Sequence, residues 1–289
     1  GAPDPMYTQP TTQYKTQKHI PPNTLPADYY SIRTEHPHWP LVIMLVLTQF
    51  SIGAFTLSSI LQSFTHSFEL NFTYGALNIM AMIFGLLALN ASLFHLGRPL
   101  HAWRAFMGIK TSWMSREILA FGAFAKLALL SGALYFLTEI ENAIGFSFPK
   151  IFHNPILVQG LSWGVSLTGI LGIFCSIKIY VDTNKDFWSF WQTSYKFLGS
   201  AILLGLASIH ATALYTIWYF KPTSLDLYMN TWGTTIVLVL LCSTLLKLSL
   251  EFALFQHKTS KPKTQLERSV YLILGPLKNI TTLRYSLGI

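Results

Sequence analysis

Two side chains that can exchange protons flank the connection between two long apolar segments. His95 follows the second apolar segment, and Glu117 precedes the third. An imidazole, whose ordinary pKa is about 6.5, and a carboxyl group at the edge of a membrane can together accept and release protons. Oxidation of a quinol removes two protons and two electrons, so this pair is sufficient as the acid–base groups for that reaction.

Three arginines lie in the same stretch as this pair. Arg98, Arg104 and Arg116 could keep the carboxyl group ionised or bind the acidic surface of a partner. Ionisable residues at a membrane border are costly and usually serve a function. The opposite interpretation is that His95 and Glu117 are ordinary interfacial residues and that the arginines only record membrane topology.

Composition indicates which elements must position these residues. Of the 289 residues, 51% are hydrophobic and only 11% are charged, whereas a soluble domain carries roughly 25% charged residues. Several stretches exceed the roughly 20 apolar residues that cross a bilayer as a helix, and they lack the alternation typical of a barrel. We therefore expect an all-α polytopic membrane protein with a bundle of six transmembrane helices. The stretches are Trp39–Phe64, Asn71–Phe94, Ile118–Thr138, Ile151–Ile177, Phe197–Phe220 and Leu227–Phe255.

The net charge of +8 comes mostly from basic residues on the connections between the predicted spans. On a soluble protein it would suggest nucleic acid, but here we expect no nucleic-acid partner, because fifteen of the 20 Lys and Arg residues lie on alternate connections. By the positive-inside rule, the N-terminal tail and the His95–Glu117 loop are predicted on the cytoplasmic side. The fifteen residues are Lys15, Lys18, Arg33, Arg98, Arg104, Lys110, Arg116, Lys178, Lys185, Lys196, Lys247, Lys258, Lys261, Lys263 and Arg268.

The sequence divides into three parts. Residues 1–38 form a polar, proline-rich tail without apolar periodicity, which is either a disordered terminus or an extended segment bound to a soluble partner. Residues 39–256 form the helical bundle with the quinol site, and residues 257–289 form a basic linker and the start of a further membrane segment. Ser115 is the expected N-cap of the third helix, which would place Glu117 in its first turn.

Neither a metal site nor a resident redox cofactor is expected within the chain. Cys175 and Cys242 both fall inside helices and form no CxxC pair, which argues against an iron–sulfur cluster and a disulfide framework. Haem ligation by two histidines needs one histidine from each of two facing helices. Away from the membrane borders, the predicted spans contain only His210. We therefore expect no haem.

Four strings in the sequence resemble one family. HLGRPLHAWRAFMGIKTSWMSREI, at residues 95–118, is the specific one. PTTQYK and ADYYSIRTEHPHWPL in the tail, with DFWSFWQTSYKFLGSAILLG after the fourth span, support it. Together they resemble the membrane anchor subunit of dimethyl sulfoxide reductase-type complexes, and the resemblance covers most of residues 10–289.

This resemblance implies a function and partners. Such anchors lie in the cytoplasmic membrane of a prokaryote and oxidise a quinol, often menaquinol. They pass electrons to a ferredoxin-like subunit with several [4Fe–4S] clusters, which feeds a molybdopterin catalytic subunit. In some relatives the ferredoxin-like part is fused in front of the anchor. A sequence that begins with Gly1 instead of Met is compatible with a longer polypeptide of that kind.

The resemblance also assigns roles to residues. The family's histidine and glutamate match His95 and Glu117, which we expect to be catalytic. The sequence departs from the family pattern in two ways: His101 stands where Arg is common, and six spans are present where the family typically has eight. The expected quinone-binding residues are His95, Arg98, Arg104, Trp113, Arg116 and Glu117.

Three other functions remain open at this point. A polysulfide-reductase-type (NrfD-like) anchor shares part of the motif and could couple quinone redox chemistry to proton movement. A secondary transporter would need broken helices in repeated halves, which the sequence does not display. A passive anchor would only hold a soluble enzyme at the membrane, and His95 and Glu117 would then be dispensable.

Overall fold

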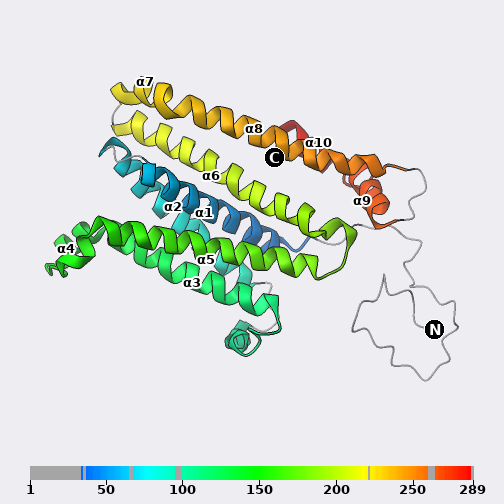
Figure 1. Cartoon of the computed structure of the whole chain (residues 1–289), viewed down its shortest axis with the longest axis horizontal. Helices are drawn as coiled ribbons and strands as arrows, with labels where there is room; N and C mark the ends of the chain where they lie inside the picture. Colours follow the sequence, from blue (N-terminus) through cyan, green and yellow to red (C-terminus); the bar gives the residue numbers. More distant parts are fainter. Residues whose placement is uncertain are drawn as a thin grey trace.

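The protein is a multi-pass membrane protein built from helices. The computed structural model describes residues 34, 37–64, 68–94, 99–220, 222–259 and 264–287. Within these residues, six helical segments are long and apolar enough to cross a membrane, and they lie side by side along the long axis of the molecule (Figure 1). The predicted all-α fold class and the six predicted spans are confirmed. Nearly all of the predicted tail, residues 1–38, lies outside the described residues.

Long helices alternate with short helical connections. The long helices are α1 (Trp39–Phe64), α2 (Phe68–Leu93), α3 (Trp113–Tyr135), α5 (Pro155–Val181), α6 (Phe190–Phe220) and α8 (Thr234–Phe252). The shorter α-helices are α4 (Leu137–Ile144), α7 (Leu225–Tyr228), α9 (Gln265–Leu274) and α10 (Lys278–Leu287). The remaining turns are η1 (Pro99–Phe106), η2 (Lys150–His153), η3 (Asp186–Trp188), η4 (Pro222–Ser224), η6 (Ala253–His257) and the π-helical η5 (Met229–Gly233).

Helix α1 lies at the centre of the bundle. It contacts α2, α5 and α6, whereas α3 packs mainly on α5, and α8 packs on α6 at one edge. The approach of α1 to α6 is very close, because a Cβ atom at Gly53 would overlap the carbonyl oxygen of Ala201. Small residues at such crossings let membrane helices gain van der Waals contact.

An apolar layer fills the middle of the bundle. Ile52, Phe55, Phe124, Val165 and Ile173 are all exposed by 1% or less. The rings of Phe55 and Phe124 meet edge to face, with their centroids 6.0 Å apart, an arrangement that aromatic pairs favour. The buried Ser51 hydroxyl beside this layer donates to the carbonyl oxygen of Ala81, so it is satisfied within the core.

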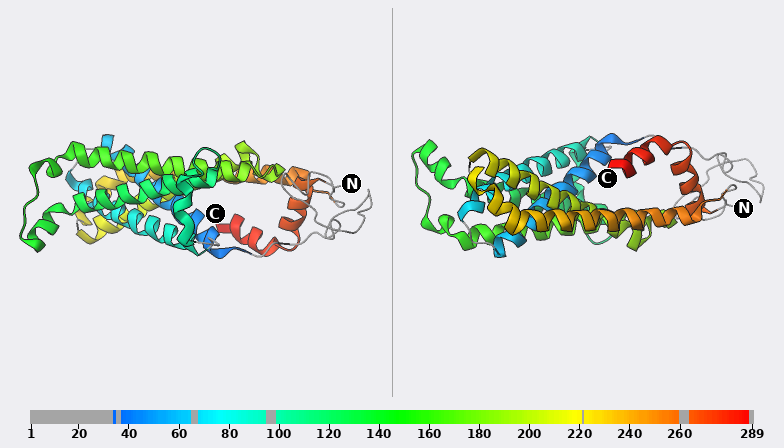
Figure 2. Two further views of the ribbon diagram at one scale, coloured as in Figure 1. Left: turned by 90° about the horizontal axis from the view of Figure 1, so that it is seen from below. Right: turned by 90° about the horizontal axis from the view of Figure 1, so that it is seen from above.

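The two ends of the bundle carry different elements. Helix α4 lies at one end and α9 at the other, where α2 ends and α3 begins (Figure 1). Helix α9 begins with a capping box, in which Thr264 and Glu267 each accept from the other's backbone N–H. Helix α10 then turns back toward the bundle, so that α8, α9 and α10 form a U (Figure 2).

Two predicted helix starts were wrong. Helix α3 begins at Trp113 instead of directly after Ser115, because Ser112 and not Ser115 is the N-cap, accepting a hydrogen bond from the backbone N–H of Ser115 at 3.4 Å. Glu117 therefore lies in the second turn of α3, not in the first. Helix α6 likewise begins well before the predicted Phe197. Hydropathy locates the part of a helix inside the membrane and misses its polar first turns.

Candidate functional site

The predicted site residues divide into two groups. His95 and Arg98 lie outside the described residues. Trp113, Arg116 and Glu117 occupy the first two turns of α3, and Arg104 lies on η1, which precedes α3 at the same end of the bundle (Figure 1). The known geometry of the site therefore centres on Glu117 and its surroundings.

Glu117 lines a cleft of about 330 Å³. The cleft lies between the last turns of α2 and the first half of α3, with Met44 of α1 at one side. Its volume falls within the range of about 300–1,000 Å³ that is typical of small-molecule sites. The lining is mostly apolar, and Glu117 is the only ionisable residue in it among the described residues. The other lining residues are Met44, Leu86, Leu89, Asn90, Ser92, Leu93, Met114, Ile118, Phe121, Gly122 and Ala125.

Helix α5 holds the Glu117 carboxylate from the side away from this lining. The Ser176 hydroxyl donates a short hydrogen bond to Glu117 Oε1. Ser176 is 3% exposed, and its Oγ also lies 3.2 Å from the carbonyl oxygen of Gly172. At Gly172 a Cβ atom would overlap the ring of Phe121 on α3. The close packing of α3 on α5 thus brings the hydroxyl to the carboxylate.

Sequence reasoning did not find Ser176. It lies 59 residues from Glu117 in the sequence, inside an apolar span, and belongs to no recognisable motif. Asn90 was missed as well, although a lone amide in the last turns of an apolar helix is a weak signal for a polar site. Its Nδ2 donates to the carbonyl oxygen of Leu86 at 2.9 Å, so its side-chain oxygen remains available as an acceptor in the cleft.

Arg116 bonds to the backbone of the preceding segment and not to Glu117. Its Nε donates to the carbonyl oxygen of Ile109 and its Nη2 to that of Lys110, both at 2.8 Å. The guanidinium also lies over the Trp113 ring, 4.1 Å from its centroid, as expected for a cation–π contact. Arg116 therefore ties the connection between η1 and α3 to the first turns of α3.

Trp113 and Arg104 lie outside the lining of the cleft. The Trp113 ring meets Phe174 of α5 edge to face at 5.9 Å and has the Lys178 ammonium 5.4 Å from its centroid. Arg104 is exposed, and its guanidinium lies 5.8 Å from the ring centroid of its neighbour Trp103. Of the predicted quinone-binding residues that the structure describes, only Glu117 lines the cleft. Direct contact of the other three with a quinone stays a prediction.

These contacts define what the arrangement can do chemically. A carboxyl group at the wall of an apolar cleft can exchange a proton with a hydroxyl group of an apolar molecule bound there. The Ser176 hydrogen bond fixes the orientation of that carboxyl group. The cleft lies within the membrane-spanning part of α2 and α3, so a lipid-soluble molecule could reach it from the bilayer.

A comparison with known families agrees with this fold. The family described as "DMSO reductase anchor subunit (DmsC)" matches residues 32–282. The chain belongs to this family. That match covers all six membrane spans and the Glu117 cleft. The resemblance inferred from the sequence motifs is therefore confirmed.

Two curated proteins are similar to this member of the DmsC family. A sulfite dehydrogenase subunit of Allochromatium vinosum is 29% identical over 200 residues, which cover 65% of this chain and 55% of that protein. A subunit of the anaerobic dimethyl sulfoxide reductase of Haemophilus influenzae is 27% identical over 186 residues, which cover 60% of this chain and 57% of that protein. The chain thus spans little more than half the length of these relatives. No solved structure matches it.

Proposed function

We propose that this anchor subunit oxidises a quinol in the Glu117 cleft and passes the electrons to an iron–sulfur partner. The observation that carries the proposal is the Glu117 carboxylate at the wall of a mostly apolar cleft of ligand size between two membrane-spanning helices. A quinone head group is flat, apolar and carries oxygens at opposite edges. Such a molecule suits a cleft with an apolar lining and a few polar groups.

The proton balance assigns a role to each polar group. Oxidation of one quinol to quinone releases two protons and two electrons. Glu117 accepts a proton from one hydroxyl group, while Ser176 holds its carboxylate in place. We propose His95, which follows α2 two residues after Leu93, as the acceptor at the other hydroxyl group. The same groups serve quinone reduction when electrons flow in the opposite direction.

The proposal extends to partners and location. The electrons would pass to a ferredoxin-like subunit or fused domain with [4Fe–4S] clusters, and then to a molybdopterin catalytic subunit. The similar proteins are named as subunits of a sulfite dehydrogenase and a dimethyl sulfoxide reductase, which supports a complex of this class. The quinone would be menaquinone, and the membrane the cytoplasmic membrane of a prokaryote, with the Glu117 end of the bundle facing the cytoplasm.

The apolar layer disfavours the alternative of an anchor that also moves protons across the membrane. Beyond that layer lie Ser59 and Ser166, whose hydroxyl oxygens are 3.3 Å apart. Ser166 and Ser176 are ten residues apart on α5, or about 15 Å at 1.5 Å per residue. Buried apolar side chains such as Ile52, Phe124 and Ile173 occupy much of that interval. The buried Ser51 hydroxyl there already donates to the carbonyl oxygen of Ala81.

Substitution of Glu117 tests the proposal. In the assembled complex, Glu117→Gln should lower quinol-dependent reduction of the partner by at least about 100-fold, as expected for loss of a general base. Asp182→Asn is the matched control, because Asp182 is an exposed acid at the same end of the bundle and does not line the cleft. Equal turnover of both variants in complexes that co-purify normally would refute the proposal.

A further inference from the structure

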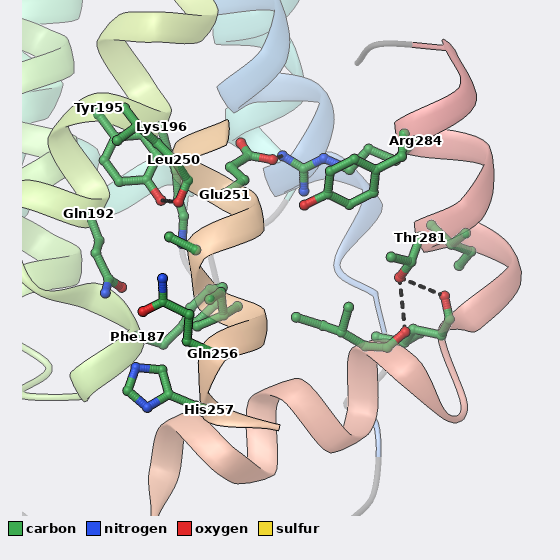
Figure 3. A pocket seen from close by; sticks show the side chains of 16 residues that line it. Phe187, Gln192, Tyr195, Lys196, Leu250, Glu251, Gln256, His257, Thr281 and Arg284 are labelled. Atoms are coloured by element: carbon green, nitrogen blue, oxygen red, sulfur yellow. Dashed lines mark hydrogen bonds and ion pairs between the residues drawn. The ribbon is translucent and has the colours of Figure 1, made fainter. Parts of the chain in front are cut away.

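A second cavity, of about 450 Å³, lies inside the U formed by α8, α9 and α10. Its walls come from the start of α6, the end of α8, η6, α9 and α10, and Figure 3 shows its polar side chains. Tyr195 and Lys196 on α6 face Glu251 on α8, and Arg284 on α10 completes the polar side. The quinol site uses none of these residues.

The cavity combines an excess of positive charge with aromatic and apolar walls. Lys196 and Arg284 line it, and Glu251 is the only acid among its described lining residues. That acid is already paired, because Arg284 Nη2 forms a close ion pair with Glu251 Oε2, and Lys247 Nζ lies 3.9 Å from its Oε1. Among the described residues, Lys196, Lys247 and Arg284 thus bring three formal positive charges to the neighbourhood of one carboxylate, an excess that favours an anionic ligand.

Lys196 and Lys247 retain donors for such a charge. The Lys196 ammonium lies 3.6 Å from the centroid of the Phe187 ring, a contact that uses no hydrogen-bond acceptor. Lys247 donates to Ser200 Oγ at 2.9 Å. A lysine ammonium has three N–H donors, so both side chains can still donate to an anionic oxygen.

An apolar groove continues from the cavity toward the middle of the membrane. It has a volume of about 270 Å³, runs between α6 and α8, and shares Tyr195 and Leu250 with the cavity. The groove extends along α8 from Leu250 to Ser243, or about 10 Å at 1.5 Å per residue. Leu198, Ile202 and Leu246 also line it, and Lys247 contributes the one charged side chain among its described lining residues. A lining that is mostly aliphatic suits a hydrocarbon tail.

The depth of the cavity matches the border between lipid head groups and acyl chains. Lys196 lies six residues after the start of α6 at Phe190, which corresponds to about 9 Å along the helix. Helix α10 leaves Ile280, Leu283 and Leu287 exposed by 67%, 58% and 60%. An amphipathic helix of this kind lies at the surface of a bilayer with its apolar side chains in the lipid.

We propose that this cavity binds the phosphate of an anionic phospholipid, with one acyl chain in the groove between α6 and α8. Lys196 and Arg284 of the cavity neutralise the phosphate, with Lys247 of the adjoining groove as a further cation, since basic pockets between membrane helices bind anionic head groups. A quinone head group is neutral and would leave the excess positive charge unbalanced. The lipid would thus hold α10 against α8 at the end of the bundle that also carries the Glu117 cleft.

Lipid retention by the purified full-length protein tests this proposal. The delipidated protein is mixed with phosphatidylglycerol or phosphatidylcholine micelles, and bound lipid is counted by native mass spectrometry. We expect preferential retention of phosphatidylglycerol. Lys196→Gln should lower its retention about fivefold or more, whereas Lys185→Gln, an exposed lysine at the same end outside the cavity, should leave it unchanged.

A second variant separates a bound lipid from a bound phosphate ion. Ile202 lines the groove and not the cavity, so Ile202→Trp should fill the groove and lower lipid retention without removing charge. Inorganic phosphate that binds while no lipid is retained would overturn the lipid assignment. Equal retention of the two phospholipids by the unaltered protein, or equal loss in Lys196→Gln and Lys185→Gln, would overturn the proposal as a whole.

Discussion

At the scale of single residues, the site depends on how one carboxylate is held. Glu117 contributes the group that can exchange a proton, and Ser176 fixes it through a buried hydroxyl. Position at a membrane border made Glu117 a candidate in the sequence, because ionisable residues are costly there, and the family resemblance then selected it. Ser176 could not be identified in that way, since its role arises only from the packing of α5 on α3.

Removal of the Ser176 hydroxyl should impair turnover without preventing assembly. A hydrogen bond to a charged group contributes about 1.5–3 kcal/mol, so Ser176→Ala should lower kcat for quinol oxidation roughly tenfold or more, with little change in KM. Steady-state kinetics of the assembled complex measure both constants.

The matched control removes another buried hydroxyl from the same helix. Ser166 is 1% exposed and lies beyond the apolar layer from Glu117, so Ser166→Ala should leave kcat close to that of the unaltered protein. If both variants lose turnover to the same degree, Ser176 has only a structural role.

At the scale of elements, the close approach of α1 to α6 fixes the centre of the bundle. Helix α1 contacts three neighbouring helices, and Gly53 lies where a side chain would overlap the backbone of α6 at Ala201. Backbone atoms cannot move aside as flexible side chains can. Added volume at this position must therefore separate the two helices.

Gly53→Ala should destabilise the bundle. Overpacking of a close contact typically costs about 1–3 kcal/mol, so the variant should unfold at a lower temperature or denaturant concentration in detergent. Gly160→Ala, at a position on α5 where a Cβ atom would meet no heavy atom within 4 Å, should leave stability unchanged or raise it by up to about 1 kcal/mol, because alanine favours a helix more than glycine does. Equal stability of the two variants would contradict a tight α1–α6 contact.

The helices themselves were predictable, but their ends and partners were not. Six long apolar runs predicted six spans, because each membrane-spanning helix must present about 20 apolar residues to lipid. The start of α3 was misplaced because Ser112 and Trp113 precede the apolar run. The ion pair between Glu251 and Arg284 was also unpredictable, since it depends on the return of α10 toward α8.

At the scale of the whole molecule, the cleft and the cavity lie near the same end of the bundle. The Glu117 cleft opens between α2 and α3, and the lipid cavity lies inside the U of α8, α9 and α10 (Figure 2). A cluster of buried apolar side chains lies in the middle of the bundle. This arrangement suits quinol chemistry that takes place, and releases its protons, at one side of the membrane.

The central claim, that a quinone binds in the Glu117 cleft, is tested most directly by mapping the contacts of a photoreactive quinone analogue. The full-length protein in its complex is illuminated with the analogue, digested and examined by mass spectrometry. The account predicts adducts within residues 86–93 of α2 and 114–125 of α3, which excess quinone suppresses. Adducts confined to the cavity between α6 and α10, or spread evenly over the lipid-facing helices, would contradict it.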